Sequence, residues 1–330
     1  MELSSIGIGT YLGDPGPETD AGYVSSARAF ALAGGTVFDT AANYRMGRSE
    51  RALGQVFREL ARTSFSVSTK AGYLPMGDGV TREGPSAWFQ RVLAGPGVLA
   101  AEDVVDGCHA LTPGYLAHQL RVSLEALQVA RVDVFHLHNP EHQRPVLGPE
   151  KFRGVLRRAF AACEELAAQG LIGAYGCATW NGFRVPPGAA DHLRLEELLE
   201  DALEAGGRAH HFRWIQLPLN LAMPEAFTRA CQPFGGQLLT PLEAARAAGL
   251  QVQVSASLGQ ARILAKLPAG PEAVLPGCRT PAQAALQFAR SCPGVSTALC
   301  GMSRPEHVAE NLEILRLPKT GLRELQAMVQ

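Results

Sequence analysis

Residues 112–138 read TPGYLAHQLRVSLEALQVARVDVFHLH, and this stretch contains the structural unit that recurs along the chain. Thr112-Pro113 opens a predicted helix, because proline fits the first helical turn. Leucines at positions 116, 120, 124 and 127 follow at helical spacing and predict one apolar face. Residues 132–137 are mostly apolar and predict a buried strand. The stretch therefore predicts a helix that leads into a strand.

The same alternation continues on both sides of this stretch. We expect strands at residues 5–8, 36–38, 65–69, 132–137, 172–177, 214–217, 251–255 and 295–300. We expect helices at residues 21–33, 49–60, 112–127, 152–168, 193–203, 241–248, from 280 onward, and at 303–315. Ser49 is the expected cap of the second helix. Eight such units favour an α/β fold, a closed (β/α)₈ TIM barrel with right-handed crossovers. No change of composition divides residues 1–330, which predicts one domain.

Two connections are too long to be simple turns, residues 72–110 and 218–240. Both follow predicted strands, which places them on the C-terminal face of the barrel. Long loops on that face usually build or cover an active site. A disordered insert is the alternative for each of them.

The composition limits the classes of function. Hydrophobic residues make up 46% and charged residues 18%, so the chain can bury a large core. The formal net charge of -1 argues against a nucleic-acid partner. The start has no basic segment before an apolar run, and no apolar stretch approaches the about 18 residues that span a bilayer. The seven scattered cysteines include no CxxC pair. We expect a cytoplasmic protein without a membrane partner, and no feature of the sequence indicates an oligomeric state.

Four reactive side chains fall at or just beyond the predicted strand ends: Asp39, Tyr44, Lys70 and His138. In a barrel they would converge on one mouth. This set suits proton transfer to a carbonyl oxygen. A phenol has a pKa of about 10, and a nearby Lys70 ammonium would lower it. Asp39 would pair with Lys70, and His138 would orient the substrate oxygen. None of the four needs a metal.

These residues lie in motifs that resemble the aldo-keto reductase superfamily. The matching segments are residues 35–44 (GTVFDTAANY), 47–50 (GRSE), 53–54 (LG), 68–70 (STK), 132–140 (VDVFHLHNP), 173–176 (GAYG), 301–306 (GMSRPE) and 310–311 (EN). The resemblance implies a (β/α)₈ barrel that reduces aldehydes and ketones with NADPH, without a metal. It also implies a catalytic tetrad of Asp39, Tyr44, Lys70 and His138, in which Tyr44 donates the proton.

The resemblance also implies a cofactor site. Its residues would be Thr10, Tyr11, Asp39, Thr179, Gln216, Ser257, Leu258, Gly259, Gln260, Arg262, Gly301, Ser303, Arg304, His307, Glu310 and Asn311. Gln216 would hold the nicotinamide carboxamide, and residues 257–260 would lie over the pyrophosphate, assisted by Arg262. Glu310 and Asn311 would lie near the adenine.

The expected phosphate site is at the last predicted helix. Ser303 and Glu306 form a capping-box pattern that predicts the helix start at Ser303. The free amides of a helix start bind phosphate well, and Arg304 would meet the 2′-phosphate, which favours NADP over NAD.

The chain departs from the family at three points, the first being that the cofactor segment after the eighth strand lacks the lysine that some members use for the 2′-phosphate. Ala178-Thr179 replaces the usual Ser-Asn after the fifth strand, so either Thr179 or Asn181 would have to contact the carboxamide. His307 stands where many members carry arginine or glutamine. The expected substrate pocket is aromatic and mostly apolar, with Asn139 and Asn181 adding selectivity for hydroxylated substrates, and we expect an aldehyde, a ketone or a sugar-like substrate. Its lining residues would be Tyr11, Tyr73, Trp88, Asn139 and Trp180.

Two other functions stay open. A regulatory barrel would bind the cofactor with little turnover, and the altered Ala178-Thr179 pair favours it. A metal-dependent barrel hydrolase or isomerase would use the H-x-H pair of His136 and His138 as metal ligands, but no other His, Asp or Glu cluster lies at a strand end to complete three ligands. His138 and His142 also sit in an H-x-x-E-H pattern, which is typical of zinc proteases. Pro140 argues against that pattern, because we expect no helix at a strand exit that contains proline. His136 is expected to point into the barrel, and we assign it no role.

Overall fold

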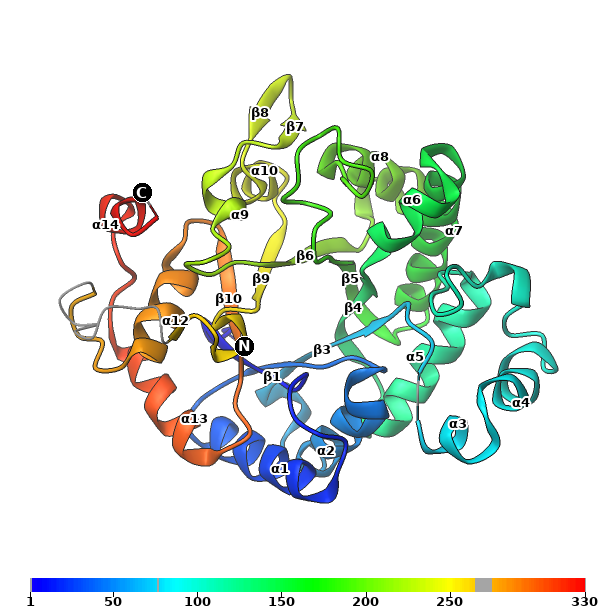
Figure 1. Cartoon of the computed structure of the whole chain (residues 1–330), viewed down its shortest axis with the longest axis horizontal. Coiled ribbons are helices and arrows are strands. Elements are labelled where there is room, and N and C mark those ends of the chain that lie inside the picture. Colours follow the sequence, from blue (N-terminus) through cyan, green and yellow to red (C-terminus); the bar gives the residue numbers. More distant parts are fainter. Residues whose placement is uncertain (1, 76, 265–274, 330) are drawn as a thin grey trace.

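The computed structural model describes residues 2–75, 77–264 and 275–329, and within them eight parallel strands close into a barrel (Figure 1). The order around the barrel is β1-β10-β9-β6-β5-β4-β3-β2. These strands are β1 (Ile6–Gly9), β2 (Val37–Asp39), β3 (Ser66–Ala71), β4 (Val132–His138), β5 (Ile172–Ala178), β6 (Phe212–Pro218), β9 (Gln251–Ser255) and β10 (Val295–Gly301). The predicted (β/α)₈ barrel is confirmed.

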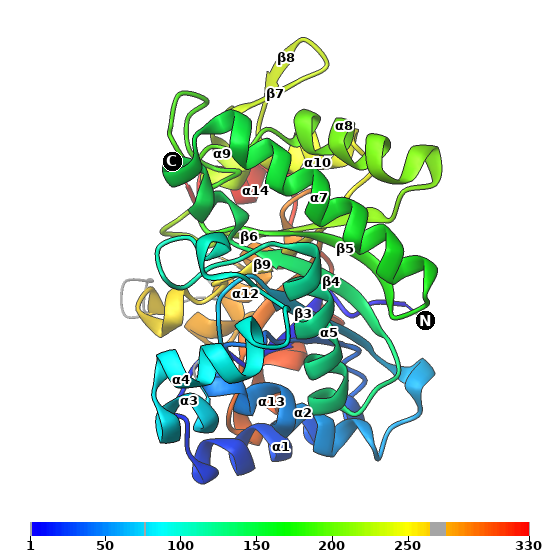
Figure 2. The ribbon, with the colours of Figure 1, turned by 90° about the vertical axis from the view of Figure 1, so that its right-hand side faces the viewer.

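Helices surround the barrel on the outside, as Figures 1 and 2 show from two directions. They are α1 (Pro17–Leu32), α2 (Arg48–Phe57), α5 (Pro113–Leu127), α7 (Pro149–Ala168), α8 (Leu195–Gly206), α10 (Pro241–Ala247), α12 (Pro281–Ser291) and α13 (Pro305–Leu312). The chain also forms the short helices α6 (Arg144–Leu147) and α14 (Leu322–Ala327) and the 3₁₀ turns η2 (Arg62–Ser64), η6 (Gly207–Ala209), η7 (Gly259–Ala261) and η9 (Glu313–Arg316).

The core lies between the strands and the apolar faces of these helices. In α5, Leu116, Leu120 and Leu127 are fully buried, as the leucine spacing predicts. Thr112 caps this helix, and its hydroxyl accepts a hydrogen bond from the backbone of Tyr115. Helix α2 packs against α5 at Gly54, where an added Cβ would lie 2.2 Å from the carbonyl oxygen of Ala126. Only glycine allows this approach.

Two predicted helix starts are wrong. Ser49 lies inside α2, because the helix begins at Arg48 after Gly47, whose φ of 77° suits glycine. The Ser49 hydroxyl donates instead to the backbone oxygen of Thr10, at 2.6 Å. Helix α13 begins at Pro305 with Arg304 as its extended N-cap, so Ser303 caps nothing. The physical reason is that a residue before proline avoids the helical region, and Arg304 therefore cannot be the first helical residue.

Both long connections contain structure of their own among the described residues, so neither is a disordered insert there. Residues 72–110 contain α3 (Asp78–Glu83), α4 (Pro85–Phe89), a π-helical turn (Gln90–Ala94) and a 3₁₀ turn, η4 (Ala101–Asp103). Residues 218–240 contain α9 (Glu225–Thr228) and the hairpin of β7 (Gln232–Phe234) and β8 (Gln237–Leu239). The hairpin turns at Gly235 and Gly236, which both have positive φ.

The argument from Pro140 is also corrected. Pro140 begins a 3₁₀ helix, η5 (Pro140–Gln143), because proline suits a first helical turn. His138 remains on β4, outside that turn. In the described part of the chain, no group of three or more His, Cys, Asp and Glu side chains is placed to hold a metal ion. Nor do the helices described there include one long and apolar enough to cross a membrane.

Candidate active site

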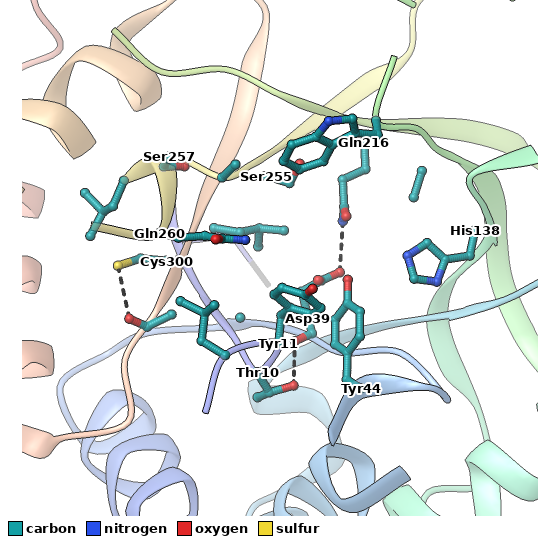
Figure 3. A pocket seen from close by; sticks show the side chains of 18 of the residues that line it. Thr10, Tyr11, Asp39, Tyr44, His138, Gln216, Ser255, Ser257, Gln260 and Cys300 are labelled. Carbon is teal, nitrogen blue, oxygen red and sulfur yellow. Dashed lines mark hydrogen bonds between the residues drawn. The ribbon is translucent and has the colours of Figure 1, made fainter. Parts of the chain in front are cut away.

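The barrel brings the four predicted catalytic side chains together, and Figure 3 shows three of them, Asp39, Tyr44 and His138. Asp39 ends β2, Lys70 lies in β3, and His138 ends β4. Lys70 Nζ lies 2.6 Å from Asp39 Oδ2 and donates to the backbone oxygen of Thr40, at 2.8 Å. Tyr44 lies beside this pair, with its ring centre 4.9 Å from Lys70 Nζ and 5.7 Å from the His138 ring centre. Tyr44 and His138 both face the same cavity.

An unusual turn holds Tyr44 in place. Arg45 and Met46, which follow it in η1 (Tyr44–Gly47), have φ values of 49° and 59°. Left-handed backbone at residues other than glycine costs free energy and must be held by the surroundings. The buried Arg45 side chain does this, because its Nη2 binds Asp20 Oδ1 at 2.6 Å and also donates to the backbone oxygen of Asp14. The loop before α1 and the start of α1 therefore support the position of Tyr44.

Burial controls the protonation of the site. Burial raises the pKa of Tyr44 above its ordinary value, and the Lys70 charge lowers it without reversing the shift. The expectation that Lys70 produces a net lowering is therefore wrong for this state of the protein, although its contribution has the expected sign. Burial would lower the pKa of Lys70, but Asp39 and Tyr44 outweigh it and raise that pKa. Burial, followed by the Lys70 charge, holds the pKa of His138 well below its usual range. At neutral pH, Tyr44 keeps its proton and His138 is uncharged.

The tetrad opens into a cavity of about 540 Å³, which is within the range of small-molecule sites. In Figure 3, Tyr44 and His138 lie on one side, and Ser257, Gln260 and Cys300 lie on the other. Many of the predicted residues line it: Thr10, Tyr11, Asp39, Tyr44, Tyr73, His138, Asn139, Thr179, Trp180, Gln216, Ser257, Leu258, Gln260 and Gly301. Lys70 is buried behind Asp39 and does not line the cavity.

Gln216 lines the cavity, and its amide oxygen is free to accept a hydrogen bond. Its Nε2 donates to Asp39 Oδ1 at 2.9 Å and to Gln253 Oε1 at 3.0 Å. Both amide hydrogens are thereby used, so its Oε1 is the atom left to accept a hydrogen bond from a bound group. A carboxamide supplies such a donor. Thr179 has its hydroxyl 3.5 Å from the backbone oxygen of Gln216 and also lines the cavity.

The residues predicted to bind the adenosine end of the cofactor lie beside this cavity. Arg262, Ser303, Arg304 and His307 are exposed, and none of them lines the cavity. Asn311 is buried, and its Nδ2 contacts the sulfur of the lining residue Cys300 at 3.7 Å. Asn311 Oδ1 is buried without a hydrogen-bond partner among the described residues. Glu310 accepts a hydrogen bond from Thr280 at 2.5 Å. The orphaned amide oxygen and the exposed Arg304 fit an adenine amine and a phosphate, respectively.

Two candidates lie away from the cavity. Trp88 packs against a separate apolar cluster of Leu93, Leu99, Ala110 and Tyr115, which joins the long connection to α5. Asn181 is held away from the cavity, because its Nδ2 donates to Asp191 and its Oδ1 accepts from Arg184. Thr179 is therefore the only one of the two alternatives after β5 that reaches the cavity.

Sequence reasoning missed several residues of the site. Asn43, Ala256 and Cys300 line the cavity, as does Ser255, which the sequence places at the end of the seventh strand but for which it indicates no role. Ser68 and Gln253 bind the polar groups beneath it. For Ser68 and Gln253 the available signal was the alternation of polar residues along their strands, because every second residue of a barrel strand points inward.

Asparagine 139 and Tyr73 form a polar pair in the cavity wall. Asn139 Nδ2 donates to Tyr73 Oη at 3.3 Å. The cavity lining also includes Tyr11 and Trp180, which are both more than one third exposed. Of the predicted pocket residues, Tyr11, Tyr73, Asn139 and Trp180 line the cavity and Trp88 does not.

Comparisons with known proteins agree with this architecture. The chain is 31% identical to D-threo-aldose 1-dehydrogenase of a Pseudomonas species over 144 residues, 44% of this chain and 40% of that protein. It is 27% identical to human aldo-keto reductase family 7 member A3 over 158 residues, 48% of this chain and 36% of that protein. The matched part thus spans less than half the length of these relatives.

A solved structure matches over nearly the whole chain. The aldo/keto reductase of Klebsiella pneumoniae, crystallised with NADP and acetate, has a TM-score of 0.67 and 20% identity, and the match covers 99% of this chain and 90% of that one. This likeness concerns the fold. The model of the aldo/keto reductase family matches residues 5–185, which is more than half of the chain. The protein therefore belongs to the aldo/keto reductase family.

Proposed function

We propose that this protein, as one domain over residues 1–330, is an NADP-dependent oxidoreductase that interconverts carbonyls and alcohols. The proposal depends most on one observation: Tyr44 and His138 face one cavity beside the buried Lys70–Asp39 pair. When bound, NADPH would supply the hydride for the carbonyl carbon, and NADP would accept one in the reverse direction.

The side chains of the tetrad would handle the proton. Tyr44 Oη donates a proton to the carbonyl oxygen as the alcohol forms, and recovers it in the reverse direction. Neutral His138 donates a hydrogen bond that orients the same oxygen. Lys70 stabilises the negative charge that develops on Tyr44 after the proton leaves, and Asp39 keeps Lys70 charged and in position.

The cofactor would be held by the predicted set of residues. Gln216 Oε1 and Thr179 would contact the carboxamide, and Asn311 would contact the adenine. Residues 257–260 would lie over the pyrophosphate, and Arg304 would meet the 2′-phosphate, so NADP is preferred to NAD. The Klebsiella protein with NADP supports this choice.

The substrate would be a small aldehyde, ketone or sugar-like carbonyl. Aromatic faces at Tyr11 and Trp180 and polar groups at Asn139 and Tyr73 suit a hydroxylated compound. The name of the related D-threo-aldose 1-dehydrogenase supports including aldoses among the candidates.

A substrate screen tests the proposal. The absorbance of NADPH would be followed with a panel of aldehydes, ketones and aldoses, beside the same panel with NADH, and the reverse reaction would be run with NADP and alcohols. We expect turnover with at least one carbonyl and a preference for NADPH. Tight NADPH binding without turnover across the panel would instead support the regulatory barrel, for which the only specific observation is the Ala178-Thr179 pair.

A further inference from the structure

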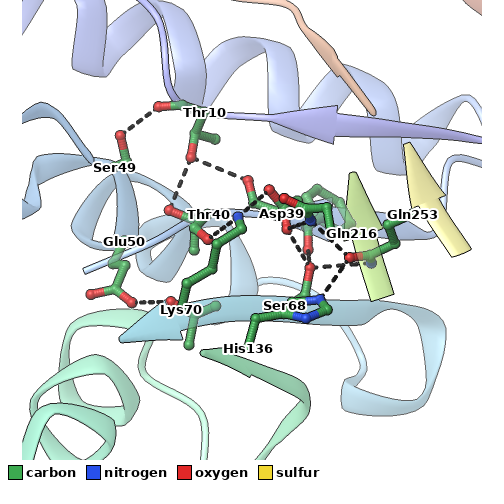
Figure 4. Close-up of polar contacts among 12 residues, drawn as sticks. Thr10, Asp39, Thr40, Ser49, Glu50, Ser68, Lys70, His136, Gln216 and Gln253 are labelled. Carbon is green, nitrogen blue, oxygen red and sulfur yellow. Dashed lines mark hydrogen bonds and ion pairs between the residues drawn. The ribbon is translucent and has the colours of Figure 1, made fainter. Parts of the chain in front are cut away.

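A closed ring of hydrogen bonds lies beneath the tetrad (Figure 4). Ser68 Oγ donates to Asp39 Oδ1 at 2.7 Å, and Gln216 Nε2 donates to the same oxygen at 2.9 Å. Gln216 Nε2 also donates to Gln253 Oε1 at 3.0 Å. Gln253 Nε2 donates to Ser68 Oγ at 3.3 Å and closes the ring. All four side chains are buried.

His136 supports this ring from the barrel interior. Its Nε2 lies 3.0 Å from Gln253 Oε1, and because that oxygen can only accept, His136 carries its hydrogen on Nε2. Burial, followed by the Lys70 charge, lowers the pKa of His136 to about 4, so it supplies this hydrogen bond without a charge. Gly176 leaves room for the imidazole, since an added Cβ there would lie 3.0 Å from His136 Nδ1.

Gln253 therefore has a position that no other residue of the ring has. Its Oε1 accepts from both Gln216 and His136, and its Nε2 reaches the serine that holds Asp39. It does not line the cavity. Through its bond to Gln216 Nε2, Gln253 leaves Gln216 Oε1 available to the cavity. Through Ser68, it helps to hold Asp39 Oδ1, so that Asp39 Oδ2 is left for Lys70.

We propose that Gln253, supported by His136, is a positioning residue that couples the cofactor contact of Gln216 to the placement of the Asp39–Lys70 pair. This inference rests on the proposed function in so far as Gln216 meets a nicotinamide. Without the ring, the Gln216 amide is free to rotate, and Asp39 loses part of the support for one carboxylate oxygen.

The replacement Gln253→Met tests this proposal, because methionine has a similar length but offers no amide to the ring. Dissociation of NADPH would be measured by its fluorescence without any carbonyl, and kcat and KM would be measured with a substrate from the screen. We expect the Kd for NADPH to rise and kcat to fall, each by about tenfold, which is the scale of one lost hydrogen bond. The carbonyl KM should change less than either.

The matched control is Gln251→Met, the same replacement on the same strand at an exposed position. We expect its Kd and kcat to stay within about twofold of wild type. If Gln253→Met lowers the melting temperature while Kd and kcat remain within that range, Gln253 is only structural and the proposal is overturned.

A second variant covers the case in which Gln253→Met does not fold. Ser68→Ala removes one hydroxyl from the ring but keeps the Gln216–Gln253 bond. We expect kcat to fall severalfold while the Kd for NADPH stays near that of wild type. An unchanged kcat in this variant would overturn the coupling. The NADPH titrations proceed even if wild type turns over no carbonyl, so failure of the proposed function and failure of this inference are separate results.

Discussion

Glu141 offers a quantitative test of how burial acts near the site. Its Oε1 accepts hydrogen bonds from the backbone nitrogens of Trp180 at 2.7 Å, Asn181 at 3.1 Å and Gly182 at 3.4 Å. Its Oε2 is buried without a partner among the described residues. Burial raises the pKa of Glu141 from 4.5 to about 7, against the lowering effect of these backbone hydrogen bonds. The loop that carries Trp180 into the cavity wall thus depends on a carboxyl group that binds its proton unusually tightly.

The perturbation is Glu141→Gln, which keeps an oxygen acceptor for the loop and removes the titration. The folded protein binds the Glu141 proton more tightly than the unfolded chain does. The free energy of unfolding therefore falls as pH rises from 4.5 to about 7. A shift of this size corresponds to about 3 kcal/mol, at 1.36 kcal/mol for each pKa unit. Glutamine does not titrate, so the free energy of unfolding of the variant does not fall in this way. Relative to wild type, it should rise by about 3 kcal/mol over the same pH interval.

Urea unfolding at pH 5 and at pH 8 measures this difference. The control is Glu150→Gln. This replacement removes a carboxylate of the same charge from an exposed position. We expect the control to follow the pH dependence of wild type. If Glu141→Gln and wild type lose the same stability between these two pH values, the account of Glu141 as a buried, protonated clamp is wrong.

Three further replacements test the fold and the tetrad by urea unfolding against wild type. Lys70→Met leaves Asp39 without its buried partner and should cost about 3 kcal/mol of stability, together with nearly all carbonyl reduction. Thr240→Ala removes the capping box of α10 and should cost about 1 kcal/mol. Gly176→Ala places a Cβ 2.0 Å from the backbone oxygen of Trp214 and should cost about 2 kcal/mol or more. An unchanged unfolding midpoint in any one of them contradicts the contact on which it is based.

The sequence predicts the barrel well because the signal recurs in every unit. Strand-like and helix-like segments alternate along the whole chain, so an error at one boundary leaves the order of elements intact. The positions of Asp39, Lys70 and His138 at or near strand ends follow from the same pattern, since parallel strands of a barrel end on one face. Their convergence was therefore predictable.

Other features depend on balances that a pattern does not contain. The net pKa direction of Tyr44 depends on how burial compares with the charge of Lys70. Trp88 was expected in the cavity because it lies in a long connection, but that connection has its own apolar cluster. The ring around Gln253 requires the register of β9 against β6, which places Gln253 beside Gln216.

The most direct measurement for the proposed function is NADPH oxidation by Tyr44→Phe, with the substrate found in the screen. Tyr44 is half-buried beside Lys70 and faces the cavity, and phenylalanine keeps its shape while it removes the proton. We expect most carbonyl reduction to be lost, while NADPH binds about as tightly as to wild type. If the variant reduces the carbonyl at the wild-type rate, Tyr44 is not the proton donor and the assigned chemistry is wrong.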